Sequence, residues 1–116
     1  MAGMRVLVGA SGYSYKPWKG SFYPEDPPDA DMLDFYARHL PTVEFNNTFY
    51  RLPKPSVLES WQACTPAGFR FVLKAPRRIT HVQRLKETGE LTDNLFKTAD
   101  SLGAKLGPIL FQLPPT

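Results

Sequence analysis

The sequence predicts an α/β fold with a parallel sheet, in the order β-α-β-α-β-α-β, corresponding to the first half of a TIM-type (β/α)8 barrel. Short apolar runs alternate along the chain with amphipathic segments of helical period, which favours parallel strands joined by right-handed crossovers. All 12 prolines fall in the expected loops or at element edges. The loops after the expected strands are long and polar, as in barrels, where the site lies at the carboxyl ends of the strands.

Length and composition limit this fold to one unit. The chain has 116 residues, 42% hydrophobic and 22% charged, so we expect one domain over residues 1–116. A complete barrel has eight strands and typically ~250 residues. Because the pattern supplies only four strands, the expected domain is half of a barrel, either as a natural short protein or as a fragment.

Cysteine usage and hydropathy bear on the compartment. Cys64 is the single cysteine, so an intramolecular disulfide is excluded. No apolar run approaches the ~18 residues of a membrane-spanning helix, and no signal peptide is recognisable. These features predict a cytoplasmic protein with no membrane partner.

The first strand is expected over residues 5–10 (RVLVGA), an apolar run that ends at glycine and serine. Residues 11–28 form a loop rich in glycine, proline and aromatic residues. A helix is expected over residues 29–40, with Asp29 or Asp31 able to cap its start. Its apolar stripe has the spacing i, i+3, i+4 and i+7 and consists of Leu33, Tyr36, Ala37 and Leu40.

The second strand is expected over residues 42–46 (TVEFN), followed by a loop over 47–53. A helix follows, because Ser56 and Glu59 match a capping box. Four residues give this helix its buried side: Val57, Leu58, Trp61 and Cys64.

The third strand is expected over residues 70–75 (RFVLKA) and leads into a long basic loop. A helix over 91–102 ends at Gly103, a typical C-cap glycine. The fourth strand, 108–113 (PILFQL), ends at two prolines. The strands over 5–10 and 108–113 each leave one edge unpaired, which predicts possible self-association.

Polar residues converge at the carboxyl ends of these strands. Glu44 and Asn46 lie two residues apart on one strand, so both point to one face. A buried carboxylate requires a partner, and Lys74 on the neighbouring strand is the expected one. Two interpretations stay open: a buried Glu44–Lys74 ion pair that only organises the barrel, or a general acid or base at Glu44 with a pKa tuned by Lys74.

The basic loop around His81 carries an excess of positive charge, with no acidic residue between Glu59 and Glu87. A solvated loop is the simplest interpretation. The alternative is an anion site or a proton-transfer role for His81. The basic residues of this stretch are Arg70, Lys74, Arg77, Arg78, Arg84 and Lys86.

Aromatic residues crowd the same end of the expected sheet, either as a lid over the barrel mouth or as a stacking platform for a base or a sugar ring. Tyr15 and Trp18 are the best candidates for stacking, because their polar tips also donate hydrogen bonds. Two histidines and one cysteine, widely separated, exclude a Cys/His zinc module. We therefore expect no metal and no cofactor. A doubly wound sheet is the alternative architecture, but Gly9 and Gly12 match its phosphate loop only weakly.

Four blocks of this sequence resemble the YecE-like family of uncharacterised proteins. They are residues 9–24 (GASGYSY, WKGSFYP), 42–53 (TVEFNNTFYRLP), 71–81 (FVLKA, RITH) and 106–115 (LGPILFQLPP). Tyr13 stands where tryptophan is common, and Asn47 where serine is common. The resemblance implies a TIM-type barrel of roughly twice this length, similar to the xylose isomerase and endonuclease IV superfamily, and it supplies no established activity.

The leading functional hypothesis is a barrel protein that binds a phosphorylated or polyhydroxylated ligand, with hydrolase- or isomerase-like acid/base chemistry. Glu44, Lys74 and His81 are the candidate catalytic residues. The alternatives are a non-catalytic nucleic-acid-binding module, whose affinity falls steeply with salt, or a fragment with no activity of its own. The candidate ligand-binding residues are Ser11, Tyr15, Trp18, Asn46, Asn47, Tyr50, Arg51, Arg78 and Gln112.

Overall fold

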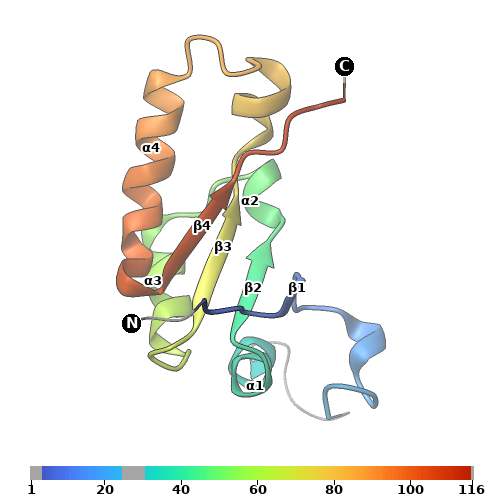
Figure 1. Cartoon of the computed structure of the whole chain (residues 1–116). Coiled ribbons are helices and arrows are strands. Elements are labelled where there is room, and N and C mark those ends of the chain that lie inside the picture. The colour runs from blue at the N-terminus through green and yellow to red at the C-terminus, as the bar shows by residue number, and fades with distance from the viewer. Residues whose placement is uncertain (1–3, 25–30, 116) are drawn as a thin grey trace.

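The structure is a computed structural model that describes residues 4–24 and 31–115. Its centre is a four-stranded parallel sheet in the order β1-β2-β3-β4 (Figure 1). The strands are β1 (Gly9–Ser11), β2 (Thr42–Phe45), β3 (Arg70–Lys74) and β4 (Leu106–Leu110). The predicted α/β class, the parallel pairing and the strand order are confirmed.

One face of this sheet is covered by helices. The helices are α1 (Met32–His39), α3 (Pro55–Ala63) and α4 (Gly89–Ala99), the last continued by the 3-10 segment η4 (Asp100–Lys105). All of them contribute to one core cluster, together with Val43, Phe45, Phe71 and Leu73 of the strands. A doubly wound sheet carries helices on both faces. The sequential strand order and the single covered face therefore match a barrel segment.

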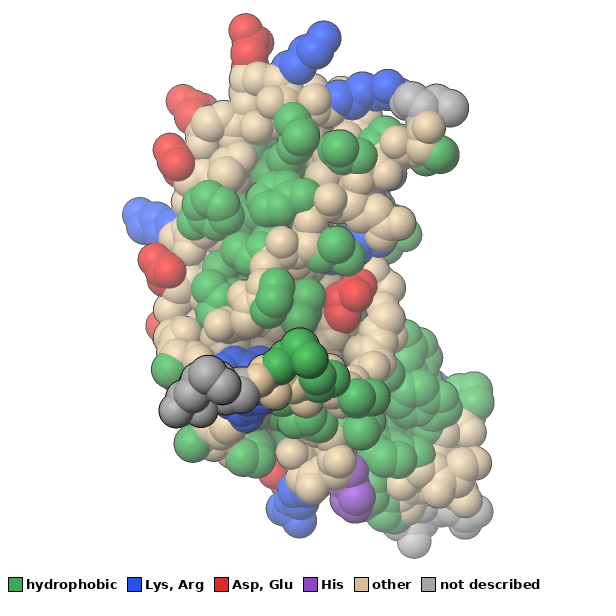
Figure 2. All heavy atoms as spheres, viewed as in Figure 1, with side chains coloured by type: hydrophobic (Ala, Val, Ile, Leu, Met, Phe, Trp, Pro, Cys, Tyr) green, Lys and Arg blue, Asp and Glu red, His purple; other side chains and the backbone are tan. Residues whose placement is uncertain are grey.

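No helix within the described residues covers the opposite face of the sheet (Figure 1). Side chains alternate along each strand, so the neighbours of the core residues point away from the helices and are only half-buried. Figure 2 shows this face, with hydrophobic side chains gathered over its middle. We call it the open face; its residues on β2 and β3 are Thr42, Glu44, Arg70, Val72 and Lys74.

The first predicted strand is largely wrong. Only Gly9–Ser11 pairs with β2, whereas residues 4–8 have no strand structure and cross in front of the sheet before β1 begins (Figure 1). Arg5 and Leu7 line a cavity of about 450 Å³ at the beginning of the strands, together with Val72. The apolar run at 5–8 thus lies over the open face instead of extending β1, and Val6 and Val8 stay exposed.

The short β1 is held closely against β2. A Cβ atom at Gly9 would lie 2.0 Å from the carbonyl oxygen of Thr42. Tyr36 of α1 ties the two strands together, because its hydroxyl accepts from the Ala10 N–H at 2.7 Å and donates to the Thr42 carbonyl at 2.8 Å. This buried tyrosine fixes the position from which the following loop departs.

Helix ends differ from the sequence patterns. α3 begins with Pro55 in its first turn after the N-cap Lys54, so the predicted capping box of Ser56 and Glu59 is wrong. Asp31 is the N-cap of α1 but makes no side-chain capping bond; Asp29 lies outside the described residues. Cys64 is exposed rather than buried.

Several loops contain helical turns that the sequence patterns did not predict. They are η1 (Lys16–Trp18), α2 (Asn47–Tyr50) and η3 (Arg78–Val82), the last a single turn of π-helix. The predicted C-cap glycine is wrong: the C-cap of α4 is Asp100, and Gly103, with φ 56° and ψ −132°, instead forms a kink within η4. β4 begins at Leu106 and ends at Leu110, two to three residues before the predicted limits.

Candidate functional site

The candidate site lies where the strands end on the open face. Ser11 ends β1 and is in register with Glu44 of β2, while Lys74 ends β3 opposite Leu110 of β4. Because the strands are parallel, their carboxyl ends form a common edge. The predicted convergence of these polar residues therefore has a structural basis, but the structure divides them into two groups.

The first group joins β1 to β2 through side-chain hydrogen bonds. Asn46 Nδ2 donates to Ser11 Oγ at 2.8 Å, and Ser11 Oγ donates to Glu44 Oε1 at 3.4 Å. Tyr15 Oη donates to the backbone oxygen of Ser11 at 2.5 Å. The second carboxylate oxygen of Glu44 has no hydrogen bond within the described residues, so it is available to a ligand hydroxyl.

The second group surrounds the ring of Phe49. Lys74 Nζ lies 4.4 Å from the centroid of that ring, a cation–π contact. The His81 ring meets the same ring edge-on at 5.1 Å, and Thr80 Oγ1 lies 2.8 Å from His81 Nδ1. Lys74 and His81 thus both contact the Phe49 ring, and the anion site at these residues stays a prediction.

The predicted ion pair between Glu44 and Lys74 is wrong. Among the described residues, Glu44 contacts the Ser11 hydroxyl and Lys74 contacts the Phe49 ring, and no ion pair joins them. Both side chains are half-buried on the open face. Water reaches each charge there, so neither needs an ionic partner.

Thr48 fixes the spacing between the two groups. Its hydroxyl is fully buried and lies 2.8 Å from the carbonyl oxygens of both Phe45 and Lys74. It also accepts the backbone N–H of Lys74 at 3.1 Å. The short helix α2 is therefore pinned to the end of β3, and Phe49 follows directly. Sequence reasoning missed Thr48, although it belongs to a block that was singled out, and counted Phe49 only among the aromatic residues that crowd this end of the sheet.

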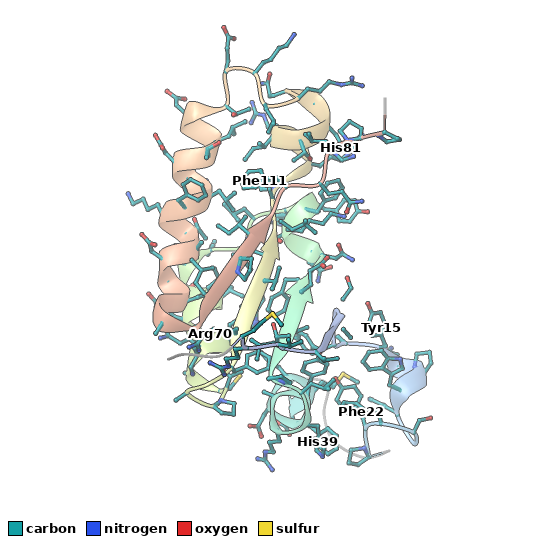
Figure 3. The ribbon with its side chains drawn as sticks, viewed as in Figure 1. Tyr15, Phe22, His39, Arg70, His81 and Phe111 are labelled. Atoms are coloured by element: carbon teal, nitrogen blue, oxygen red, sulfur yellow. The ribbon has the colours of Figure 1, made fainter. Side chains whose placement is uncertain are left out.

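The remaining predicted residues lie around these groups without joining them. The Tyr15 and Trp18 rings pack against each other at 4.6 Å, and Trp18 stacks on Tyr23. Figure 3 shows Tyr15 and His81 at well-separated places, at the ends of β1 and β3. Five further candidates have exposed side chains that reach neither group: Asn47, Tyr50, Arg51, Arg78 and Gln112.

A cavity of about 140 Å³ opens beside the first group. Sequence reasoning had assigned Trp61 to the buried side of a helix and Phe45 to the helix-facing side of its strand, and it gave Ser14, in the loop after the first strand, no role. Burial raises the pKa of the Tyr13 hydroxyl, which keeps this group protonated and able to donate. The cavity is lined by Gly12, Tyr13, Ser14, Tyr15, Phe45, Asn46, Asn47 and Trp61.

The described ranges, 4–24 and 31–115, contain neither a metal-ligand cluster nor a membrane-spanning helix. No cluster of three or more His, Cys, Asp and Glu side chains is placed to hold a metal ion there. No helix in these ranges has the length and apolar character needed to cross a membrane.

Curated relatives share the sequence over part of their length. The UPF0759 protein YecE of Escherichia coli (strain K12) is 38% identical over 84 residues, which are 72% of this chain and 31% of that protein. The UPF0759 protein YunF of Bacillus subtilis is 31% identical, over 95% of this chain and 40% of its own length. The chain thus spans about a third to two-fifths of the curated relatives it matches.

Solved structures share the fold. A DUF72 family protein from Thermotoga maritima superposes with a TM-score of 0.79 at 32% identity, over 93% of this chain and 44% of that chain. A DUF72 family protein from Enterococcus faecalis gives a TM-score of 0.76 at 24% identity, which shows the fold alone. The family model described as "Protein of unknown function DUF72" matches residues 7–116. The chain therefore belongs to the DUF72 (UPF0759, YecE-like) family, and it covers part of the length of its relatives.

Proposed function

We propose that the open face binds a phosphorylated or polyhydroxylated small molecule at the carboxyl ends of the strands. The observation that carries this proposal is the pairing of two unlike groups on one edge. One offers the carboxylate of Glu44, oriented by the Ser11 hydroxyl, and the other offers the ammonium of Lys74 and the imidazole of His81, which both contact the Phe49 ring. A carboxylate accepts from ligand hydroxyls, and a cation with an imidazole suits an anion.

The roles follow from position. Glu44 has a free carboxylate oxygen and acts as general acid or base in hydrolase- or isomerase-like chemistry. Lys74 and His81 hold the anion, with the exposed Arg78 at the start of η3 as a third cation that a bound anion would attract. Asn46 and Gln112 orient the ligand, and Tyr15, backed by the Trp18 ring, offers a stacking surface.

A thermal-shift screen of sugar phosphates, polyols and inorganic phosphate tests this proposal on the chain. A ligand at 100 times its Kd stabilises the folded state by about 2.7 kcal/mol, which raises Tm by several degrees. Glu44→Gln and Lys74→Ala are expected to reduce the shift, whereas Glu59→Gln, exposed on α3, is expected to leave it unchanged. Indifference of every hit to both site variants would contradict the proposal.

A second candidate function is non-catalytic binding of nucleic acid. The observation that favours it is a group of exposed basic side chains around η3: Arg77, Arg78, Arg84 and Lys86. Phosphate contacts predict an affinity that falls steeply as salt rises. Fluorescence anisotropy with single-stranded and double-stranded oligonucleotides over a salt series measures this slope. A salt-independent affinity, or no binding, rejects it.

We also propose that the chain associates with a second copy of itself through its sheet edges. β1 and β4 each have one neighbour in the sheet, and apolar side chains near both edges are exposed, including Val8 at 67% and Leu110 at 37%. Such edges favour pairing with another chain. Sedimentation is expected to show a discrete dimer that Val8→Lys with Leu110→Lys dissociates. A wild-type monomer at all concentrations would contradict this.

A further inference from the structure

The cavity of about 140 Å³ extends from the first group toward the core side of β2. Phe45, which lines it, belongs to the core side of the sheet, whereas Glu44 points to the open face. Trp61, which stacks on Phe45 in the same aromatic wall, comes from α3, one of the helices that cover the core side. The cavity therefore adjoins the first group, with which it shares Tyr15 and Asn46, and it is entered between the loop after β1 and the start of α2.

The wall of this cavity is aromatic. The rings of Phe45 and Trp61 are stacked at a centroid distance of 4.0 Å and an interplanar angle of 10°. Tyr13 meets Phe45 edge-on at 5.6 Å. Phe45 is buried and Trp61 is half-buried. The three side chains hold one another in place, so a ligand would meet a rigid aromatic surface.

The rim of the cavity is polar and preorganised. Gly12 has φ 89°, and a Cβ atom there would lie 2.5 Å from Tyr15 Oη. Tyr15 in turn bonds the Ser11 carbonyl, which fixes the loop. Asn46 uses its Nδ2 on Ser11 Oγ. Within the described residues, its Oδ1 and the side-chain amide of Asn47 have no hydrogen-bond partner, so both can pair with a ligand.

The volume selects the size of the ligand. A dry cavity of roughly 150 Å³ takes up benzene, so a space of about 140 Å³ holds a single six-membered ring. A pyranose, with its ring substituents, is larger than this. The amide groups of Asn46 and Asn47 lie exposed at the rim, so they favour a ring that carries hydrogen-bonding atoms over an unsubstituted hydrocarbon ring. We propose that this cavity binds a planar nitrogen heterocycle of pyrimidine size.

The two tryptophans make this proposal measurable. Trp18 does not line the cavity, so Trp18→Phe leaves Trp61 as the single tryptophan and as a reporter inside the cavity. Titration of this variant with uracil and with cytosine is expected to give a saturable change in Trp61 fluorescence. Benzene, a ring of matched size without polar groups, is expected to bind at least tenfold more weakly.

Variants on the rim sharpen the test. Asn47→Ala removes one amide pair and is expected to weaken uracil or cytosine binding about tenfold, as one hydrogen bond allows. Glu59→Gln, on the same helix as Trp61 but outside the cavity, is the control and is expected to retain full affinity. Inorganic phosphate is expected to leave the Trp61 signal unchanged, which separates this cavity from the anion group on the open face.

Three outcomes would overturn the proposal. They are the absence of a saturable response at Trp61, equal affinity for benzene and the two pyrimidines, and an identical response in Trp61→Phe, where Trp18 is the single tryptophan. The first two need no rim variant, so they decide the matter even if Asn47→Ala fails to fold. Failure of the open-face site in the thermal-shift screen would leave these outcomes unaffected.

Discussion

The two faces of the sheet are built by the same strands and differ in almost every property. On β3, Phe71 and Leu73 point to the helices and are fully buried, whereas Arg70, Val72 and Lys74 point the other way and are half-buried. The helix side contains aromatic and aliphatic side chains in one continuous core. The open face contains charges whose contacts are hydrogen bonds and a cation–π pair.

This difference separates stability from function along the chain. Apolar burial supplies most of the favourable free energy of folding, and here it is concentrated on one side of the sheet. The open face contributes less to that core, so its residues can serve ligand contacts with smaller consequences for folding. Substitutions on alternate residues of one strand should therefore have very different costs.

The largest expected difference is between Phe71→Ala and Val72→Ala. Truncation of the fully buried Phe71 leaves a cavity among Phe45, Phe69 and Trp61 and is expected to lower the free energy of unfolding by about 3–5 kcal/mol. Val72→Ala is expected to cost less than about 1 kcal/mol. Urea denaturation of both variants measures the contrast, and equal costs would show that the open face is covered in solution.

The second prediction compares two threonines, the buried Thr48 and the half-buried Thr42 on the open face. Thr48→Val removes the buried hydroxyl that serves the Lys74 N–H and two carbonyl groups, at a cost of about 1–3 kcal/mol. Thr42→Val removes one bond to the Arg70 carbonyl where water has access, and about 1 kcal/mol or less is expected. Calorimetry compares the two, and the reverse order would refute the assignment of Thr48 as the pin between β2 and β3.

The third prediction uses pH to probe the aromatic cluster beside α1. Burial raises the pKa of Tyr23 from 10.0 to about 12, so the protonated hydroxyl is favoured in the folded state. The stability from this group is therefore complete below about pH 10 and lost as pH rises toward 12. Tyr23→Phe is expected to lose the bond to the Tyr13 carbonyl but to show a shallower alkaline decline.

Urea midpoints measured between neutral pH and pH ~12 follow this decline. Tyr50→Phe, at an exposed position on α2, is the matched control and is expected to decline as the wild type does. A Tyr23→Phe decline as steep as that of the wild type would place the alkaline sensitivity elsewhere, and Tyr36 is then the next residue to substitute, since burial raises its pKa as well.

The smallest expected effect is that of Glu44→Gln on stability. Breaking a buried ion pair costs about 3–5 kcal/mol, but Glu44 has only the Ser11 hydroxyl as its partner in the described chain, and glutamine retains an acceptor there. A change within about 0.5 kcal/mol is expected. If denaturant titrations show that the free energy of unfolding falls by several kcal/mol, Glu44 forms an ion pair with Lys74 in solution.

Sequence reasoning predicted the order of elements because strands and helices differ in hydrophobic period and because prolines mark their limits. It failed where tertiary contacts decide. Residues 5–8 have the composition of a strand, but only Gly9–Ser11 pairs with β2. Ser56 fits a capping box, but Pro55 already occupies the first turn of α3. Cys64 continues an apolar stripe, yet it follows the last helical residue, Ala63, and is exposed.

The candidate site was predicted in its place but not in its contacts. Parallel strands brought Ser11, Glu44 and Lys74 to one edge, which needed no more than the strand order. The partner of Lys74 could not be deduced, because it depends on the helical turn α2 that presents Phe49. The cavity beside Trp61 depends on how the loop after β1 folds over α3, and no periodic pattern reports that.

The close approach of Gly9 to the backbone of β2 restricts which residues are tolerated at this position. Any other side chain would place its first carbon 2.0 Å from the Thr42 carbonyl oxygen, in contact with backbone that cannot rotate away. In a library of single substitutions, every replacement of Gly9 should be depleted, whereas Gly89, with open space around its missing side chain, should accept alanine. The backbone of the neighbouring strand thus requires glycine at the first residue of β1.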